Sequence, residues 1–161
     1  MGRSLLVLTV SLVICLGAGW AGSLLTRPAV LSDWYEQLAK PAWTPSGWLI
    51  ASVWRTLFAL MGLSLWMVWM QRSASPRRTR PALVLFAVQL LLNVAWSYFF
   101  FALKRPGAAL IEICVLWIAI LATIVACWRV RPAPAVLMLP YLAWVGFAAF
   151  LNGAIWRLNS R

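Results

Sequence analysis

The chain has 161 residues, of which 64% are hydrophobic and only 11% are charged. A soluble domain of this length is close to half apolar, so the composition predicts one domain that lies mostly in lipid. The 14 lysines and arginines outnumber the three acids and give a net charge of +11, but they lie in short breaks between apolar runs, which argues against nucleic-acid binding.

Five apolar stretches are each long enough to cross a bilayer, which takes about 20 helical residues. Prolines and charges separate them, and no strand alternation is found. The predicted spans cover residues 5–25, 48–70, 82–103, 107–128 and 136–156. The sequence therefore predicts an all-α, multi-pass integral membrane protein, a single five-transmembrane-helix bundle over residues 1–161. A cleavable signal peptide is the alternative interpretation of the first span.

The loop at residues 27–46, between the first two spans, holds more acidic, aromatic and proline residues than a simple connector needs. Its central segment, "DWYEQLAKPAWTP", holds two of the three acids, three aromatic residues and two prolines. Pro41 and Pro45 fix their φ angles and stiffen the loop. The preceding "SDWYEQL" predicts a short helix with Ser32 or Asp33 as N-cap. A plain anchor at the membrane interface is one interpretation of this loop.

Tryptophans and amides mark the interior of the predicted bundle. Most of the twelve tryptophans fall near span ends, where indole rings favour the headgroup boundary, but four lie deeper: Trp54, Trp96, Trp117 and Trp144. Helical spacing places two of them on faces that also carry polar residues: Gln89, Asn93, Trp96 or Ser97, and Phe100 in the third span; Tyr141, Trp144, Ala148 and Asn152 in the fifth. Amides at this depth either join helices or line a ligand cavity, and both interpretations stay open.

Two ionisable residues lie within spans. Arg55 and Glu112 either extend toward the membrane surface, which is the simpler interpretation, or pair with each other. The chain has no histidine, and its three cysteines lie in apolar runs without C-x-x-C spacing, so no metal site is predicted. Acid–base chemistry would fall on Glu112 or Tyr35, which makes a conventional enzyme an unexpected outcome.

Four strings resemble the signature of the translocator protein family, also called tryptophan-rich sensory proteins or peripheral-type benzodiazepine receptors. They are "WYEQLAKPAWTPSG", "VWRTLFALMG", "QLLLNVAWSYFFF" and "LPYLAWVGFAAFLNGAIWRLN", in this order from about Trp34 to Asn159. The resemblance, to a bacterial member, implies a homodimeric five-helix membrane protein whose loop 27–46 forms a lid over an aromatic intramembrane pocket. Both an inner and an outer membrane stay open as hosts.

The resemblance also implies a function. Such a protein would be a ligand-binding sensor or regulator of tetrapyrrole or stress responses, with a porphyrin (protoporphyrin IX or haem) as ligand, lipid around it and no required cofactor. Light-dependent porphyrin degradation, in which nearby tryptophans take part, is one alternative. Transport of tetrapyrroles or lipids is another, although the chain lacks the internal repeat that transporters typically show.

The resemblance assigns ten residues to the ligand site. Tyr35 would point from the loop toward the pocket, and Pro41 and Trp43 would shape the lid. The walls would be formed by Trp54 and Phe58 of the second span, Asn93 and Trp96 of the third, and Trp144, Ala148 and Leu151 of the fifth. Trp54 and Trp144 would be the aromatic pair for ligand contact and photochemistry, and therefore the candidate catalytic residues.

The chain departs from the family pattern at several positions. Phe58 replaces a common tyrosine, Ser46 replaces a proline, and Arg55 replaces a small or neutral residue. Gly153 stands where the animal sterol-recognition segment needs a tyrosine, so sterol binding there is not expected. For the dimer, small-residue spacing points to Gly17/Ala21 or Ala18/Gly22 in the first span, while the resemblance points to Ala87 and Ala95 in the third.

Overall fold

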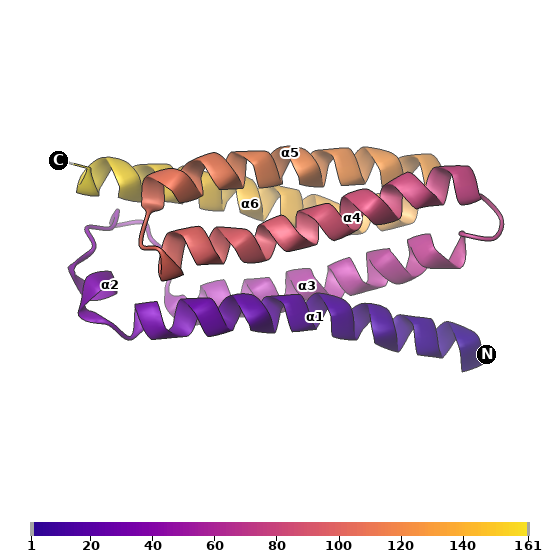
Figure 1. Ribbon diagram of the computed structural model, residues 1–161, viewed down its shortest axis with the longest axis horizontal. Helices are drawn as coiled ribbons and strands as arrows, with labels where there is room; N and C mark the ends of the chain where they lie inside the picture. Colours follow the sequence, from indigo (N-terminus) through magenta and orange to yellow (C-terminus); the bar gives the residue numbers. More distant parts are fainter. Residues whose placement is uncertain (1, 161) are drawn as a thin grey trace.

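The computed structural model describes residues 2–160, and five long helices lie side by side in it (Figure 1). The helices are α1 (Gly2–Val30), α3 (Gly47–Met70), α4 (Pro76–Ser97), α5 (Pro106–Val130) and α6 (Pro132–Asn159). The short helix α2 (Asp33–Gln37) lies in the loop between α1 and α3, and the π-helical turn η1 (Tyr98–Ala102) continues α4. All five long elements are apolar enough to cross a membrane, which confirms the predicted fold class.

Every long helix begins before its predicted span, and α1, α5 and α6 also end after theirs. Proline is the first residue of α4, α5 and α6, at Pro76, Pro106 and Pro132. A proline fits there because the first N–H groups of a helix have no partner within the helix. These prolines therefore begin helices as well as separating the apolar runs.

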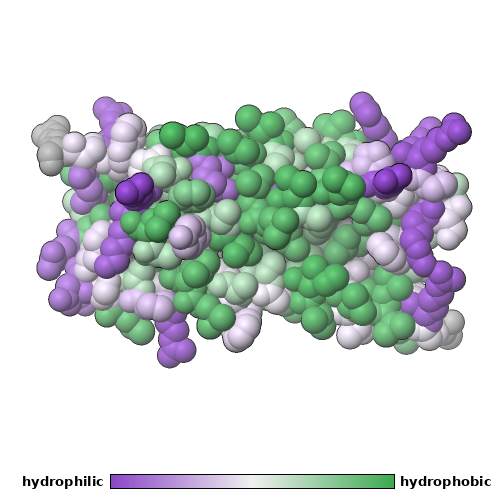
Figure 2. Space-filling model, viewed as in Figure 1, coloured by the Kyte–Doolittle hydropathy of each residue, from purple (hydrophilic) through white to green (hydrophobic). Residues whose placement is uncertain are grey.

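An apolar band covers the middle of the face seen in Figure 2, and hydrophilic side chains gather at its two ends. Residues on the outer faces of the helices are large and hydrophobic, for example Leu6, Leu91, Ile111 and Phe150, each at least 65% exposed. Such a surface is stable only in lipid. The chain is therefore a multi-pass integral membrane protein.

Helix α1 belongs to the bundle and packs tightly on α3. A Cβ atom at Gly62 would lie 2.8 Å from Leu12 Cδ2, and one at Gly19 would lie 2.5 Å from Phe58 Cδ2. The two glycines thus let the α1 and α3 surfaces approach closely. Cys15 of α1 is completely buried in the main core. The first predicted span is accordingly a structural helix of the bundle.

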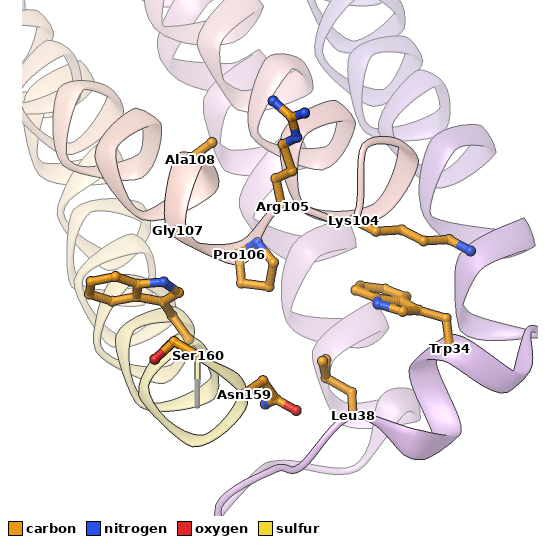
Figure 3. A pocket seen from close by; sticks show the side chains of 10 residues that line it. Trp34, Leu38, Lys104, Arg105, Pro106, Gly107, Ala108, Asn159 and Ser160 are labelled. Carbon is orange, nitrogen blue, oxygen red and sulfur yellow. The ribbon is translucent and has the colours of Figure 1, made fainter.

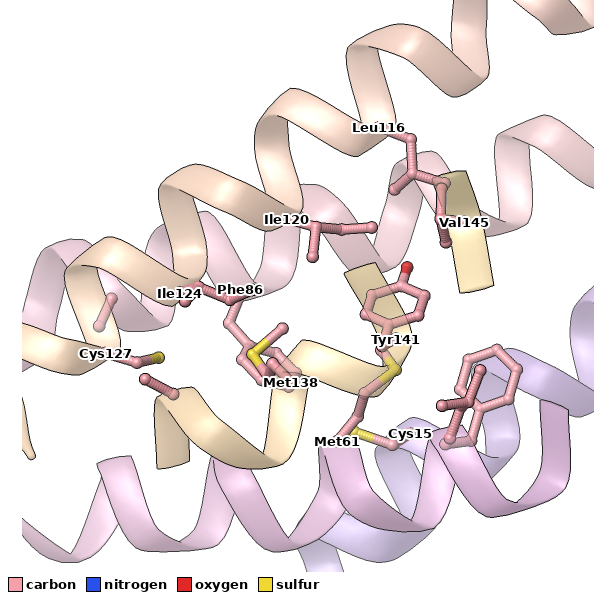
Figure 4. Packing of buried hydrophobic residues seen from close by; sticks show 14 of the residues in the cluster. Cys15, Met61, Phe86, Leu116, Ile120, Ile124, Cys127, Met138, Tyr141 and Val145 are labelled. Atoms are coloured by element: carbon pink, nitrogen blue, oxygen red, sulfur yellow. The ribbon is translucent and has the colours of Figure 1, made fainter. Parts of the chain in front are cut away.

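The main core is aliphatic and aromatic. Figure 4 shows Met61, Phe86, Ile120, Met138 and Tyr141 packed between α3, α4, α5 and α6. Each of these side chains is at most 2% exposed. Such close packing fixes the positions of the helices, and through them the residues that face the interior.

One end of the bundle, called here the loop-1 face, carries α2, the η1–α5 turn and the C-terminal end of α6 (Figure 1, left). The last turn of the third span is π-helical, and Phe100 and Phe101 within it are both buried. A smaller second core forms there from these rings together with Ala29, Leu38 and Ile155. The loop-1 face is therefore built mainly from aromatic contacts.

Candidate functional site

The polar face of α4 lies in the interior, as predicted. Gln89, Asn93 and Ser97 are all buried. Asn93 Nδ2 donates a hydrogen bond to the Tyr141 hydroxyl, with 2.9 Å between the two atoms. This bond joins α4 to α6 in the middle of the bundle, so the amide does connect helices.

Trp54 reaches the same point from α3. Its ring meets Tyr141 edge-on, with 6.2 Å between the ring centroids, and lies 5.7 Å from the ring of Phe58. Two predicted site residues, Trp54 and Asn93, thus contact Tyr141, and a third, Phe58, packs against Trp54 beside them. We call the group formed by Trp54, Phe58, Asn93 and Tyr141 the inner aromatic layer.

Trp96 belongs to a second contact group nearer the loop-1 face. Its Nε1 donates to Asn152 Oδ1 at 3.1 Å, and Asn152 Nδ2 donates to the carbonyl oxygen of Pro106 at 2.7 Å. Its ring lies 5.3 Å from Phe100 and 5.8 Å from Phe101. Asn152, which is 1% exposed, therefore links α4, α5 and α6.

Trp144 has different neighbours from Trp54. Its ring lies 5.3 Å from Phe147, whose own ring lies 5.9 Å from Trp43 of the loop. Trp43 also stacks on Phe150, with 5.4 Å between centroids and an interplanar angle of 23°. Trp43 therefore packs along α6, and within residues 2–160 the structure shows no ring contact between Trp54 and Trp144. The remaining predicted α6 residues, Ala148 and Leu151, are partly buried.

The predicted short helix in the loop is confirmed as α2, which begins at Asp33. Ser32 occupies the N-cap position, but its hydroxyl donates to the Ala29 carbonyl at 2.6 Å and so does not cap α2. Tyr35 packs 6.2 Å from Phe101, and the Lys40 ammonium lies 3.9 Å from the Tyr35 ring centroid. Partial burial raises the pKa of Tyr35 above its ordinary value.

Asn159 at the end of α6 holds the loop in place. Its Oδ1 accepts a hydrogen bond from the Ala39 N–H at 3.0 Å, and its Nδ2 donates to the Ala39 carbonyl at 2.9 Å. Beside this pair, the Pro41 carbonyl accepts bonds from both the N–H and the hydroxyl of Thr44, which closes a turn. We call the Asn159–Ala39 pair the loop latch.

Two cavities lie at the loop-1 face. The larger, of about 410 Å³ (Figure 3), is lined by Trp34, Leu38, Lys104, Arg105, Pro106, Gly107, Ala108, Trp156, Asn159 and Ser160. The smaller, of about 310 Å³, is lined by Leu24, Leu25, Pro28, Ala29, Ser32, Phe101, Ala102 and Lys104. Neither includes a residue of the inner aromatic layer, so that layer is closely packed in this structure.

Arg55 and Glu112 differ in placement. Arg55 is exposed, and its Nε donates to the Ala51 carbonyl at 3.2 Å, so it extends toward the loop-1 face as expected. Glu112 is only 9% exposed, and neither carboxyl oxygen has a hydrogen-bond partner within the described chain. The expectation that Glu112 extends to the surface is therefore wrong, because its helix face is directed inward, and it makes no pair with Arg55.

Other buried polar atoms also lack a partner within residues 2–160. They are the two side-chain amide atoms of Gln89 and the Nε1 atoms of Trp66 and Trp144. Buried polar groups are nearly always hydrogen-bonded, because leaving one unsatisfied costs about 1–3 kcal/mol. Together with the carboxyl of Glu112, these are buried side-chain polar atoms without a hydrogen-bond partner among the described residues.

The small residues considered for a dimer divide into two groups. Gly22 is buried, and a Cβ there would lie 3.3 Å from Ser97 Oγ, so the Ala18/Gly22 pair packs inside the chain. Gly17 and Ala87 lie on outward faces. Ala21 and Ala95 are partly buried, so Gly17 and Ala87 are the exposed positions among these candidates.

Sequence reasoning did not assign three residues that organise this region. Tyr141 and Asn152 are on the predicted polar face of the fifth span, and that position is the sequence signal that could have identified them; the structure shows that both are buried. Asn159 had no such signal, since its partner is backbone 120 residues away in the chain.

Comparison with known proteins gives the family. The model of the TspO/MBR family matches residues 11–157. Tryptophan-rich protein TspO from Chlorobaculum tepidum is 41% identical over 159 residues, covering 99% of each chain. Human translocator protein is 39% identical over 126 residues, which cover 78% of this chain and 75% of the human protein. The tryptophan-rich sensory protein of Cereibacter sphaeroides is 35% identical over 127 residues, which cover 79% of this chain and 77% of that protein. The five-helix membrane fold and these matches together establish that the chain belongs to the TspO/MBR family.

Proposed function

We propose that this membrane protein is a sensor or regulator that binds a porphyrin at the inner aromatic layer, beneath the loop latch. The observation that supports this most is that Trp54 and Asn93 both contact Tyr141, with Phe58 packed beside Trp54. Aromatic walls hold flat π-systems through offset and edge contacts, and a few fixed polar groups orient them. The relatives' names, sensory protein and translocator protein, support a regulatory or transport role.

Ligand entry would require the loop to move, since Tyr141 is completely buried. The loop latch consists of hydrogen bonds at exposed positions, and such bonds contribute only about 0.5–1.5 kcal/mol each. Trp144 would complete the α6 wall, because its Nε1 is free to donate within residues 2–160. Tyr35, held over Phe101 on the inner side of the loop, would close the site from above.

The test is titration of the detergent-purified protein with protoporphyrin IX in the dark, following tryptophan quenching. The site variant is Trp54→Phe/Trp144→Phe. The matched control, Trp20→Phe/Trp128→Phe, removes two indoles that are 66% and 56% exposed on the outer surface. We expect saturable quenching in the wild type and the control, with about five- to ten-fold weaker binding in the site variant. Equal, non-saturating quenching in all three proteins would show that the deep tryptophans only pack.

Illumination of the same samples tests the photochemical alternative. The edge contact of Trp54 with Tyr141 places two oxidisable rings beside the proposed ligand. In that case the porphyrin carries the reaction and the protein positions it. Loss of the porphyrin absorbance in wild type and control, but not in the site variant, would indicate turnover. A stable absorbance in all samples would indicate sensing or transport.

A homodimer is part of this proposal. The outward face of α4 at Ala87 is flanked by Val84, Val88 and Leu91, which are 57%, 42% and 72% exposed. In a Cys114→Ser background, which removes the exposed native thiol, we expect Ala87→Cys to form a disulfide-linked dimer in membranes and Gly17→Cys to do so less. The reverse ranking would place the interface on α1.

A further inference from the structure

The larger cavity at the loop-1 face has a strongly basic lining that the proposed porphyrin site does not use. It lies where the α2 segment, the η1–α5 turn and the end of α6 meet (Figure 3). Lys104 and Arg105 contribute to its lining, and no acidic side chain does. Lys104 also lines the smaller cavity, so this one side chain stands between the two hollows.

The turn between η1 and α5 adopts an unusual backbone to present these cations. Lys104 has φ 53°, and it is the only described non-glycine residue in the left-handed region. Its Nζ lies 5.7 Å from the ring centroid of Trp34, and Figure 3 shows the lysine side chain extended alongside that ring. The ammonium of this exposed residue therefore lies beside an aromatic wall of the cavity.

The beginning of α5 adds further positive potential to this cavity. The first intrahelical bond runs from the Ala109 N–H to the Arg105 carbonyl, so the N–H groups of Gly107 and Ala108 precede the hydrogen-bonded part of the helix. No side chain caps this end, and its first turn contains no acid. An uncapped end of a 25-residue helix carries a partial positive charge that favours an anion.

Gly107 shapes the opposite wall. A Cβ at this position would lie 2.8 Å from Nε1 of Trp156, so only glycine allows the indole to lie against the first turn of α5. Trp156 is 43% exposed. With Trp34 across the cavity, two indoles flank the cations, an arrangement suited to the boundary between headgroups and hydrocarbon.

Below the cavity, α5 presents a row of apolar side chains to lipid. Ile111, Val115 and Ile118 follow Ala108 at three, seven and ten residues, which keeps them on one helix face. They are 72%, 49% and 63% exposed. A molecule bound at the cavity by its anionic group can therefore lay a hydrocarbon chain on this row, which a free phosphate ion cannot do.

We propose that this cavity is a binding site for an anionic phospholipid, with the phosphate at Lys104, Arg105 and the first turn of α5, and an acyl chain along Ile111. The charge complementarity favours a lipid with net negative charge over a zwitterionic one. The continuous path from basic cavity to apolar row favours a lipid over inorganic phosphate. This site does not depend on porphyrin binding, and the test below uses porphyrin-free protein.

The test is native mass spectrometry of the delipidated, detergent-solubilised full chain after addition of phosphatidylglycerol or phosphatidylcholine with identical acyl chains. We expect one phosphatidylglycerol molecule to bind at least about ten-fold more tightly than phosphatidylcholine. Lys104→Gln/Arg105→Gln should weaken that binding by about 10- to 30-fold, since each cation near a headgroup contributes about a factor of five. The matched control, Arg77→Gln/Arg78→Gln, removes two exposed charges at the other end of the bundle and should keep the preference.

Two further variants test the shape of the site without changing its charge. Gly107→Ala should reduce phosphatidylglycerol binding by displacing Trp156, and Ile111→Ser should reduce it by shortening the apolar row. Equal affinity for both lipids, or an unchanged preference in Lys104→Gln/Arg105→Gln, would overturn the proposal. Displacement of the lipid by an equal concentration of inorganic phosphate would also overturn it, because the occupant would then be the free ion.

Discussion

The loop-1 half of the bundle and the opposite half are formed by the same five helices, but different interactions hold them together. Away from the loop, close packing of side chains such as Met138 and Phe86 dominates. A buried hydrogen bond also lies there, in which Ser64 Oγ donates to the Pro134 carbonyl at 2.9 Å. Near the loop, the links are amides and indoles, centred on Asn93, Asn152 and Asn159. The packed half fixes the helix positions, while the polar half has contacts that a ligand can replace.

The largest effect should come from a cavity in the packed half. Met138 is completely buried, so Met138→Ala should lower the free energy of unfolding by about 2–5 kcal/mol. Protoporphyrin IX affinity, measured at a temperature where the variant is fully folded, should stay within two-fold of wild type. A parallel loss of affinity in folded protein would mean that the two halves are not separable.

Removing the central amide of the polar half should have the next largest effect. Asn152→Ala leaves both Trp96 Nε1 and the Pro106 carbonyl without their partner, and we expect a loss of about 1–3 kcal/mol of stability. Ser64→Ala, which removes the polar link of the packed half, should cost about 0.5–1.5 kcal/mol. Thermal unfolding of both variants in the same detergent measures the two losses of stability. A larger loss in Ser64→Ala than in Asn152→Ala would contradict the view that polar links matter more in the loop-1 half.

The loop latch should have little effect on stability but a measurable effect on loop opening. Asn159→Ala removes both bonds to Ala39, so amide hydrogen exchange at Ala39 should accelerate by about three- to ten-fold. The free energy of unfolding should change by less than about 1 kcal/mol. Ser160→Ala is the matched control, as this neighbouring side chain has no part in the latch. Unchanged exchange in Asn159→Ala would show that other contacts hold the loop closed.

The smallest effect concerns pH. Burial disfavours the phenolate of Tyr35 and raises its pKa in the folded protein above the ordinary value near 10. The stability that this group contributes is fully present below about pH 10 and is lost as the pH rises through the folded-state pKa. The difference in absorbance at 295 nm between wild type and Tyr35→Phe should therefore titrate above pH 10. A midpoint at or below 10 would show that the loop leaves Tyr35 in water.

The spans and their interior faces could be predicted from sequence because each depends on neighbouring residues. The apolar runs fix the spans, and the spacing from Gln89 to Asn93 identifies the buried face of α4. The short helix α2 was predictable for the same reason, since its formation is local. Local patterns thus account for the fold class and for the interior position of the deep aromatic residues.

Contacts between distant segments were not predictable in this way. Nothing near Asn159 indicates that its partner is Ala39, and nothing near Trp43 indicates that it stacks on Phe150. The basic cavity could not be predicted either. In the sequence, Lys104 and Arg105 form an ordinary charged turn, and only the fold places Trp34 and Trp156 at the same cavity. These features depend on how the helices pack, and packing is not encoded in any short stretch of the chain.

The π-helical turn at Tyr98–Ala102 has a consequence for how this protein can change. A π-helical turn holds one residue more than a regular α-helical turn, which is the result expected when one residue is inserted into an α-helix. Deleting that residue would rotate everything that follows by about 100° around the helix axis, and would carry Lys104 away from Trp34. The register of the third span up to Ser97 would be untouched. One-residue changes in length at this turn are therefore a route by which relatives can acquire different surfaces at the loop-1 face while keeping the same packed half.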